Sequence, residues 1–229
     1  MAKRTDKTEE NIQAVEQALG KTEQFIEDNQ KIILIVLGSI VFVILAYFGF
    51  QRFYIAPKEK NAAAQMFMAE KYFEMDSLNL ALNGDGINPG FLTIISDYKL
   101  TKSSNLAKYY TGVIYMEKGE FEKAIDYLED FDGGDQILDP MASGAIGDCY
   151  VELGNLNKAV SNYLDAADKS KNEFSTPLFL QKAGWAYELL KDYKNAVVVY
   201  KRIKTEFPKS NEAREMDKYI ARAEGFLKK

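Results

Sequence analysis

The chain has 229 residues, a net charge of −5, 47% hydrophobic and 28% charged residues, and no histidine. This composition is typical of a folded chain. The absence of histidine removes the usual general base at neutral pH and the commonest metal ligand. A mildly negative chain also lacks the positive field that a phosphate backbone requires. We therefore expect no enzyme activity, no cofactor, no bound metal and no nucleic-acid partner.

Cys149 is the single cysteine, so the chain can form neither an intrachain disulfide nor a thiolate metal cluster. A reactive thiolate needs a basic neighbour, whereas Asp148 precedes this residue. We expect Cys149 to be a buried structural thiol.

Residues 1–31 form a polar tail with one amphipathic segment. Thr8 can cap a helix here, and Gly20 interrupts it. The apolar residues recur at helical spacing: Ile12, Val15, Leu19 and Ile26. About two heptads make a helix that is marginal in isolation. Two interpretations stay open, a loosely ordered tail near a bilayer and a docking helix for a membrane or cytosolic partner.

Residues 32–50 predict a transmembrane helix. They read IILIVLGSIVFVILAYFGF, without a charge, and fourteen of the nineteen are Ile, Leu, Val or Phe. At a rise of ~1.5 Å per residue the segment spans about 28 Å, close to the hydrocarbon thickness of a bilayer. The long preceding region and the length of the apolar run argue against a cleavable signal peptide. Soluble helices of this length show a polar face, which this segment lacks.

The charges beside this segment leave its orientation open. Five cationic residues precede it and three follow within the counted window: Lys3, Arg4, Lys7, Lys21 and Lys31 against Arg52, Lys58 and Lys60. The difference favours a cytoplasmic N-terminus. Three of the five, however, lie far from the bilayer.

Residues 58–104 are expected to form a degenerate helical unit. The pattern predicts a helix over 62–75, a second beginning at 78–82, and a third over 91–98. Glycine-rich and proline-containing turns at 83–86 and 89–90 separate the last two. The Gly84-x-Gly86 pair lacks the third glycine and the preceding strand of a nucleotide-binding motif.

Residues 105–208 contain three copies of one pattern, offset by 35 and then 37 residues. Each copy has a glycine, a tyrosine three residues later, a turn position, a large apolar residue and an alanine. The copies are Gly112, Tyr115, Gly119, Phe121 and Ala124; then Gly147, Tyr150, Gly154, Leu156 and Ala159; then Gly184, Tyr187, Lys191, Tyr193 and Ala196. This spacing resembles the tetratricopeptide repeat, a helix–turn–helix unit of 34 residues.

The residue types suit such a unit. The first glycine of each copy is expected where two helices cross too closely for a side chain, and the turn glycine where the first helix ends with positive φ. Lys191 departs from that pattern. Because a repeat stack needs capped ends, residues 209–229 are expected to form a C-terminal capping helix. The predicted fold is all-α, one transmembrane helix followed by a tetratricopeptide-repeat solenoid.

The first helices of such a solenoid line a concave face that binds peptides. The repeat register places these residues there: Tyr109, Val113, Met116, Glu117, Asp148, Val151, Gln181, Trp185 and Glu188, together with Leu106, Met141 and Glu152. The surface is apolar and edged with acid, which suits an exposed hydrophobic stretch or an amphipathic helix. Trp185 and Met116 could instead be core residues, and the glutamates an ordinary solvated face.

Residues 91–98 (FLTIISDY), Thr101 and residues 106–110 (LAKYY) carry a further resemblance. With the whole layout, they resemble the bacterial YfgM-like family, ancillary subunits of the Sec translocon. The resemblance implies a bacterial inner-membrane protein with a cytoplasmic N-terminus and a periplasmic repeat domain. It also implies a role beside the export channel, with translocon subunits, secretory chains or periplasmic chaperones as partners. The longer N-terminal tail and the better preserved repeats depart from that family.

The leading hypothesis is therefore a membrane-anchored interaction module of the protein-export machinery. A structural scaffold for an envelope-spanning machine of motility, division or secretion is the alternative. A receptor facing the cytosol, with the opposite topology, is a third.

Overall fold

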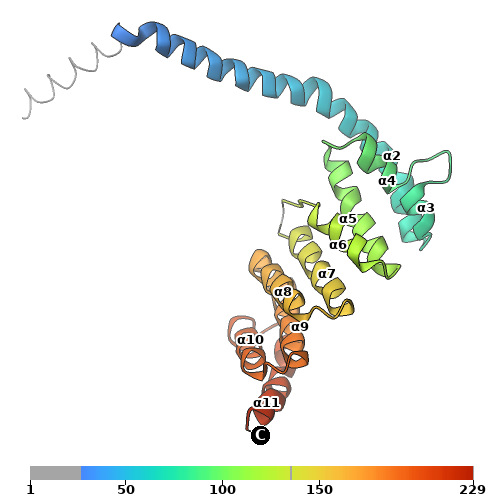
Figure 1. Ribbon diagram of the computed structural model, residues 1–229, viewed down its shortest axis with the longest axis vertical. Helices are drawn as coiled ribbons and strands as arrows, with labels where there is room; N and C mark the ends of the chain where they lie inside the picture. The colour runs from blue at the N-terminus through green and yellow to red at the C-terminus, as the bar shows by residue number, and fades with distance from the viewer. Residues whose placement is uncertain (1–26, 135, 229) are drawn as a thin grey trace, which may run out of the picture. The chain divides into compact units, whose positions relative to one another are not determined.

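A computed structural model describes residues 27–134 and 136–228 (Figure 1). Apart from an isolated bridge between Gly84 and Pro89, these residues form helices and the turns between them. The chain divides into two units, Met1–Pro57 and Lys58–Lys229. The amphipathic segment expected in the tail, from Thr8 to Ile26, lies outside the described residues.

The first unit contains a helix over residues 27–50 followed by a π-helical stretch, η1 (Gln51–Ile55). The helix Glu27–Glu74 is the one in the described part of the chain that is long and apolar enough to cross a membrane, by length and composition. No side chain in its most apolar window is buried. Phe50 and Tyr54 stack with their ring centroids 5.0 Å apart at the end of the apolar run.

Helix α2 (Ala56–Glu74) begins earlier than the helix expected over residues 62–75, and Pro57 does not interrupt it. A proline inside a helix lacks the N–H that its fourth predecessor would accept, and its ring crowds that carbonyl. The wider π-helical turn of η1 comes directly before Pro57, and there the N–H of Ala56 donates to the carbonyl of Gln51, five residues earlier. The sequence pattern missed this local adjustment.

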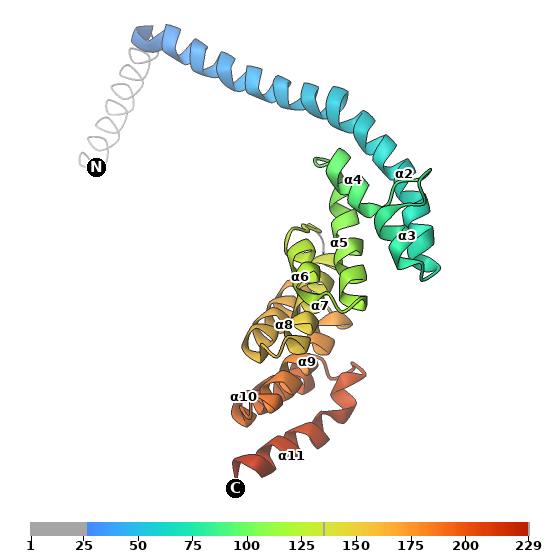
Figure 2. The ribbon, with the colours of Figure 1, turned by 45° about the vertical axis from the view of Figure 1, so that its right-hand side comes forward.

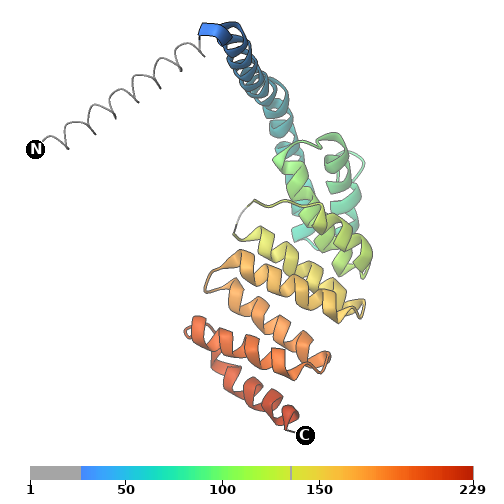
Figure 3. The same ribbon diagram turned by 60° about the vertical axis from the view of Figure 1, so that its left-hand side comes forward.

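The second unit continues as a succession of antiparallel helices. After α2 come α3 (Leu78–Asn83), α4 (Phe91–Asp97), α5 (Lys102–Glu117), α6 (Phe121–Glu129), α7 (Leu138–Glu152), α8 (Leu156–Ser170), α9 (Ser175–Leu189), α10 (Tyr193–Glu206), the 3-10 turn η2 (Glu212–Glu215) and α11 (Met216–Leu227). The pairs α5–α6, α7–α8 and α9–α10 are the first, second and third repeats. They follow one another as layers of one stack (Figures 2 and 3).

Glycine lets the two helices of each repeat cross closely. A Cβ added to Gly112 would lie 2.5 Å from Cγ of Leu128, and one added to Gly147 would lie 2.6 Å from Cε1 of Tyr163. At Gly184 the obstacle is the Tyr200 ring, which is closer still. Each large side chain therefore occupies the volume that a side chain on the first helix would need. This is the role expected of the three glycines.

Buried side chains form clusters that cover both ends of the repeats. At the N-terminal end, Met66 and Ala69 of α2 pack with Phe91 and with α5. At the C-terminal end, Met216 and Ala223 of α11 are fully buried and join the cluster of the third repeat. The C-terminal helix differs from the expected form in beginning with a 3-10 turn, where Ser210 Oγ accepts the N–H of Ala213 at 3.1 Å.

The first helix of each repeat ends with a residue of positive φ. The angles are 73° at Gly119, 72° at Gly154 and 61° at Lys191. Lys191 thus departs from the other repeats in residue type while keeping their backbone conformation. Its N–H donates to the carbonyl of Glu188 at 2.9 Å, which satisfies a carbonyl of the last helical turn.

The glycine crossing yields a first prediction. Gly184→Ala should destabilise the second unit by at least about 2 kcal/mol, because the new methyl overlaps the buried Tyr200 ring and overpacked cores cost roughly 1–3 kcal/mol. Gly225→Ala is the matched control, since nothing lies within 4 Å of a Cβ there. Removing a helical glycine should stabilise the fold by about 0.5 kcal/mol. Thermal and urea unfolding would measure both, and equal effects would contradict the assignment.

A second prediction concerns the left-handed residue. Lys191→Gly should stabilise the fold by about 0.5 kcal/mol, because relief of left-handed strain slightly exceeds the added entropy of the unfolded chain. Lys194→Gly, three residues later in α10, should destabilise it by about 1 kcal/mol, as glycine does in helices. Opposite shifts of the urea midpoint are expected; shifts of the same sign would refute the argument.

Candidate protein-interaction surface

The expected groove residues lie on the first helices of the three repeats, and many are engaged in internal packing. Tyr109 packs against Phe131, with ring centroids 5.3 Å apart, and burial raises the pKa of its hydroxyl. Met116 contacts the cluster that contains Cys149. Val113 is half-buried, and Glu117 at the end of α5 is exposed. Of these four residues of the first repeat, the acidic Glu117 is therefore the one that is exposed to a partner.

Two of the predicted acids accept a hydrogen bond from a tyrosine on the second helix of their own repeat. Asp148 accepts the Tyr163 hydroxyl at 2.6 Å and pairs with Lys182 of α9 at 2.7 Å. Glu188 accepts the Tyr200 hydroxyl at 2.9 Å. In both tyrosines, burial and then the hydrogen bond to the carboxylate raise the pKa of the hydroxyl.

The second acid has the same kind of cationic partner as the first. Glu188 pairs with Arg222 of α11 at 2.8 Å. In each ion pair the cation lies 34 residues after the acid, one repeat length, so the pairs join consecutive layers of the stack. Asp148 and Glu188 thus contribute to the stacking of the solenoid, a role that the sequence interpretation did not assign.

The remaining groove residues divide between core and surface. Gln181 is buried, and Val151 packs against the cluster of the third repeat. Trp185 has 40% of its surface exposed and meets Tyr219 of α11 edge-on, with centroids 6.2 Å apart. It is partly a packing residue of the C-terminal cap and partly accessible. Glu152 at the end of α7 is exposed.

Cys149 is fully buried, as expected. Burial, and then the charge of Asp148, raise the pKa of its thiol to about 11, so it stays protonated at neutral pH. Within the described ranges no group of three or more Cys, Asp or Glu is arranged to hold a metal ion.

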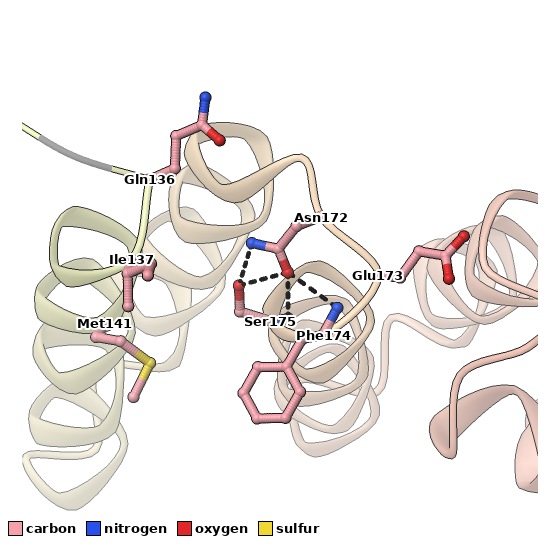
Figure 4. A pocket seen from close by; sticks show the side chains of 7 residues that line it. All are labelled: Gln136, Ile137, Met141, Asn172, Glu173, Phe174 and Ser175. Carbon is pink, nitrogen blue, oxygen red and sulfur yellow. Dashed lines mark hydrogen bonds between the residues drawn. The ribbon is translucent and has the colours of Figure 1, made fainter.

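An apolar pocket of about 560 Å³ lies where α7 and α9 begin (Figure 4). Its walls include Ile137, Met141 and Phe174, and its volume is in the range of small-ligand and side-chain pockets. Phe174 is 84% exposed and Ile137 70% exposed. We call this site the loop-edge pocket; Gln136, Asn172, Glu173 and Ser175 complete its lining.

The sequence interpretation included Met141 but missed Ile137 and Phe174. A signal was present, because each lies ten residues before the glycine of its repeat, at Gly147 and Gly184. Each is also the residue that precedes the first helix of its repeat. A large apolar residue at a solvated helix start, repeated in two units, indicates an exposed patch.

Asn172 fixes the connection that presents Phe174. Its Oδ1 accepts the N–H groups of Phe174 and Ser175 at 2.9 and 2.8 Å, and its Nδ2 donates to Ser170 Oγ at 2.7 Å. Its own N–H donates to Thr176 Oγ1 at 2.9 Å. Ser170, Ser175 and Thr176 are buried, so this network is shielded from water and stabilises one loop conformation.

Family models described as tetratricopeptide repeat match residues 106–131 and 180–210, and residues 142–168. The chain carries tetratricopeptide repeats. The matched segments fall on the first, third and second helix pairs, respectively. Comparison with curated proteins gave no significant match.

Solved structures show the same fold. Two of them come from a Podosopora anserina protein whose description names kinesin light chain and nearly identical TPR-like repeats, one with a point substitution. Each superposes with a TM-score of 0.55 at 13% identity, over 74% of this chain and 87% or 88% of the other. Identity at this level supports the tetratricopeptide-like architecture alone. Tetratricopeptide repeats point to a protein-interaction module.

The ion pairs between layers yield a third prediction. Glu188→Ala should destabilise the second unit by about 2 kcal/mol, because it leaves the Tyr200 hydroxyl without its acceptor and Arg222 without its partner. Glu117→Ala at the exposed end of α5 is the matched control and should change stability by less than about 0.5 kcal/mol. Urea unfolding of both variants measures the difference. Similar effects would mean that Glu188 does not join the layers.

Proposed function

We propose that this protein is a membrane-anchored interaction module, an accessory subunit of the Sec protein-export translocon. Residues 32–50 cross the bacterial inner membrane with the N-terminus in the cytoplasm. The repeat unit lies in the periplasm and contacts emerging chains or chaperones. No catalytic step is part of this function.

The observation that carries the anchoring is the exposure of the apolar helix. Large side chains along residues 32–50, among them Ile35, Phe42 and Leu45, are exposed. Leaving such a side chain in water forgoes roughly 1.5–3 kcal/mol each, so ten of them amount to roughly 15–30 kcal/mol. That exceeds the stability of about 5–15 kcal/mol typical of a whole domain. A lipid bilayer would remove this cost, because the segment carries no charge and its length matches the hydrocarbon thickness.

Two further points support the assignment to the export machinery. The layout of a polar tail, one apolar helix and a repeat unit is similar to that of the YfgM-like subunits, although the tail is longer here. The tetratricopeptide repeats provide a protein-binding unit, and an anchor keeps such a unit where export-channel subunits are concentrated.

The anchoring is tested by placing charge in the apolar helix. Ile40→Arg combined with Ile44→Arg should release much of the full chain into the carbonate-soluble fraction of a bacterial host, since each central arginine costs about 2.5–3.5 kcal/mol. Phe53→Arg combined with Phe67→Arg adds the same charge outside the apolar run and should stay membrane-bound. Release of the unaltered chain into the carbonate-soluble fraction would refute the membrane anchor.

Topology and partners need separate readouts. Alkaline phosphatase fused after the repeat unit should be active, because the enzyme requires the periplasm. A photo-crosslinker at Trp185 should capture export-channel subunits, secretory chains or chaperones, and capture should fall when export is blocked. Stable co-purification with a motility, division or secretion machine, unaffected by blocked export, would instead favour the scaffold alternative. Inactive phosphatase would favour a cytosolic receptor.

A further inference from the structure

The loop-edge pocket exposes apolar side chains on a connection that has one fixed conformation. Phe174 is among the most exposed large apolar residues of the second unit. The Asn172 network holds the backbone on both sides of it, and Lys171 before it adopts a left-handed conformation with φ of 41°. An aromatic side chain on a backbone that is already fixed loses less entropy on binding than one on a mobile loop, which suits an interaction anchor.

The pocket is specific to the junction of the second and third repeats. Ile137 and Phe174 occupy equivalent positions, and Met141 and Phe174 flank the space between α7 and α9 (Figure 4). In the first repeat the corresponding helix start is polar. There Thr101 caps α5, and the carboxylate of Glu59 accepts the N–H of Lys102 at 2.6 Å. The apolar surface therefore does not follow from the repeat pattern alone.

The charge at the rim restricts what can bind. Among the described residues that line the pocket, Glu173 is the one with a charged side chain. Glu173 is exposed, and its carboxylate points away from Ile137 and Met141, so it lies at the edge of the pocket (Figure 4). Lys171 is nearby in sequence but does not line the pocket. A ligand that fits would bring an apolar group to Met141 and Phe174 and a cation to the rim.

We propose that the loop-edge pocket binds a segment of a partner protein in which a large apolar side chain lies next to lysine or arginine. The apolar side chain packs between Phe174 and Met141. The cation pairs with Glu173 at the rim. The inference rests on the proposed interaction function. It adds a binding site at the start of α7 and α9, away from Trp185, and states the sequence character of the segment that binds there.

The experiment uses two labelled peptides and the full chain in nanodiscs of uncharged lipid. One peptide alternates phenylalanine with lysine, and the other has glutamate in place of every lysine. Fluorescence anisotropy should show that the lysine peptide binds at least tenfold more tightly than the glutamate peptide. Phe174→Ala should weaken the lysine peptide at least tenfold, and Glu173→Gln about threefold. Glu173→Lys should shift the preference toward the glutamate peptide.

Phe67→Ala is the matched control, because Phe67 is an exposed phenylalanine on α2, outside the pocket. It should bind like the unaltered chain, and empty nanodiscs give the contribution of lipid. Thermal unfolding should be the same for Phe174→Ala and Phe67→Ala, since both side chains are exposed.

Three results would overturn the inference: no binding of the lysine peptide, equal binding of both peptides, or loss of binding with Trp185→Ala but not with Phe174→Ala. The last result would place the peptide-binding site on the surface around Trp185 rather than in the loop-edge pocket. These results concern the pocket and are separate from the proposed function. A wrong topology or an unrelated crosslinking partner would end the export role and leave the peptide preference intact.

Discussion

The repeat unit depends on one steric constraint, the close crossing of two helices over a glycine. At Gly112, Gly147 and Gly184 the partner helix fills the free volume with Leu128, Tyr163 or Tyr200. Because interiors are packed to crystal-like density, that volume admits either the ring or a Cβ on the first helix, not both. The crossing determines how the first helices are spaced, and with them the surface that the stack presents.

Two of these side chains, Tyr163 and Tyr200, link the crossing of helices within a repeat to the packing of one repeat on the next. Tyr163 and Tyr200 extend past their glycines and donate hydrogen bonds to Asp148 and Glu188 on the first helices. These carboxylates in turn pair with a cation of the next layer. Partly buried acids with two partners are positioned by the fold, so they are poorly suited to recognise a ligand. The surface left for recognition is displaced toward the helix ends.

The surfaces available for interaction in this architecture are those where apolar side chains stay exposed after folding. In the described part of the chain, such regions include an apolar helix without a buried face and an apolar pocket at the start of α7 and α9. The first has the length and composition of a helix that could cross a membrane, and the second is lined by Ile137, Met141 and Phe174. Exposed patches of this kind mark interaction sites in soluble and membrane proteins alike.

The sequence by itself determined the all-helical repeat architecture, the apolar segment, the glycine crossings and the burial of Cys149. These follow from local periodicity and from residue size, which are readable along the chain. Only the tertiary structure decided that Asp148 and Glu188 join layers, that Lys191 keeps the left-handed turn of its glycine equivalents, and that Ile137, Met141 and Phe174 meet. The ion pairs and the pocket depend on which side chains come together from different layers, and a pattern along one helix carries no information about its neighbour across the stack. The conformation of Lys191 is local, but lysine rarely adopts a positive φ, so the residue type did not reveal it.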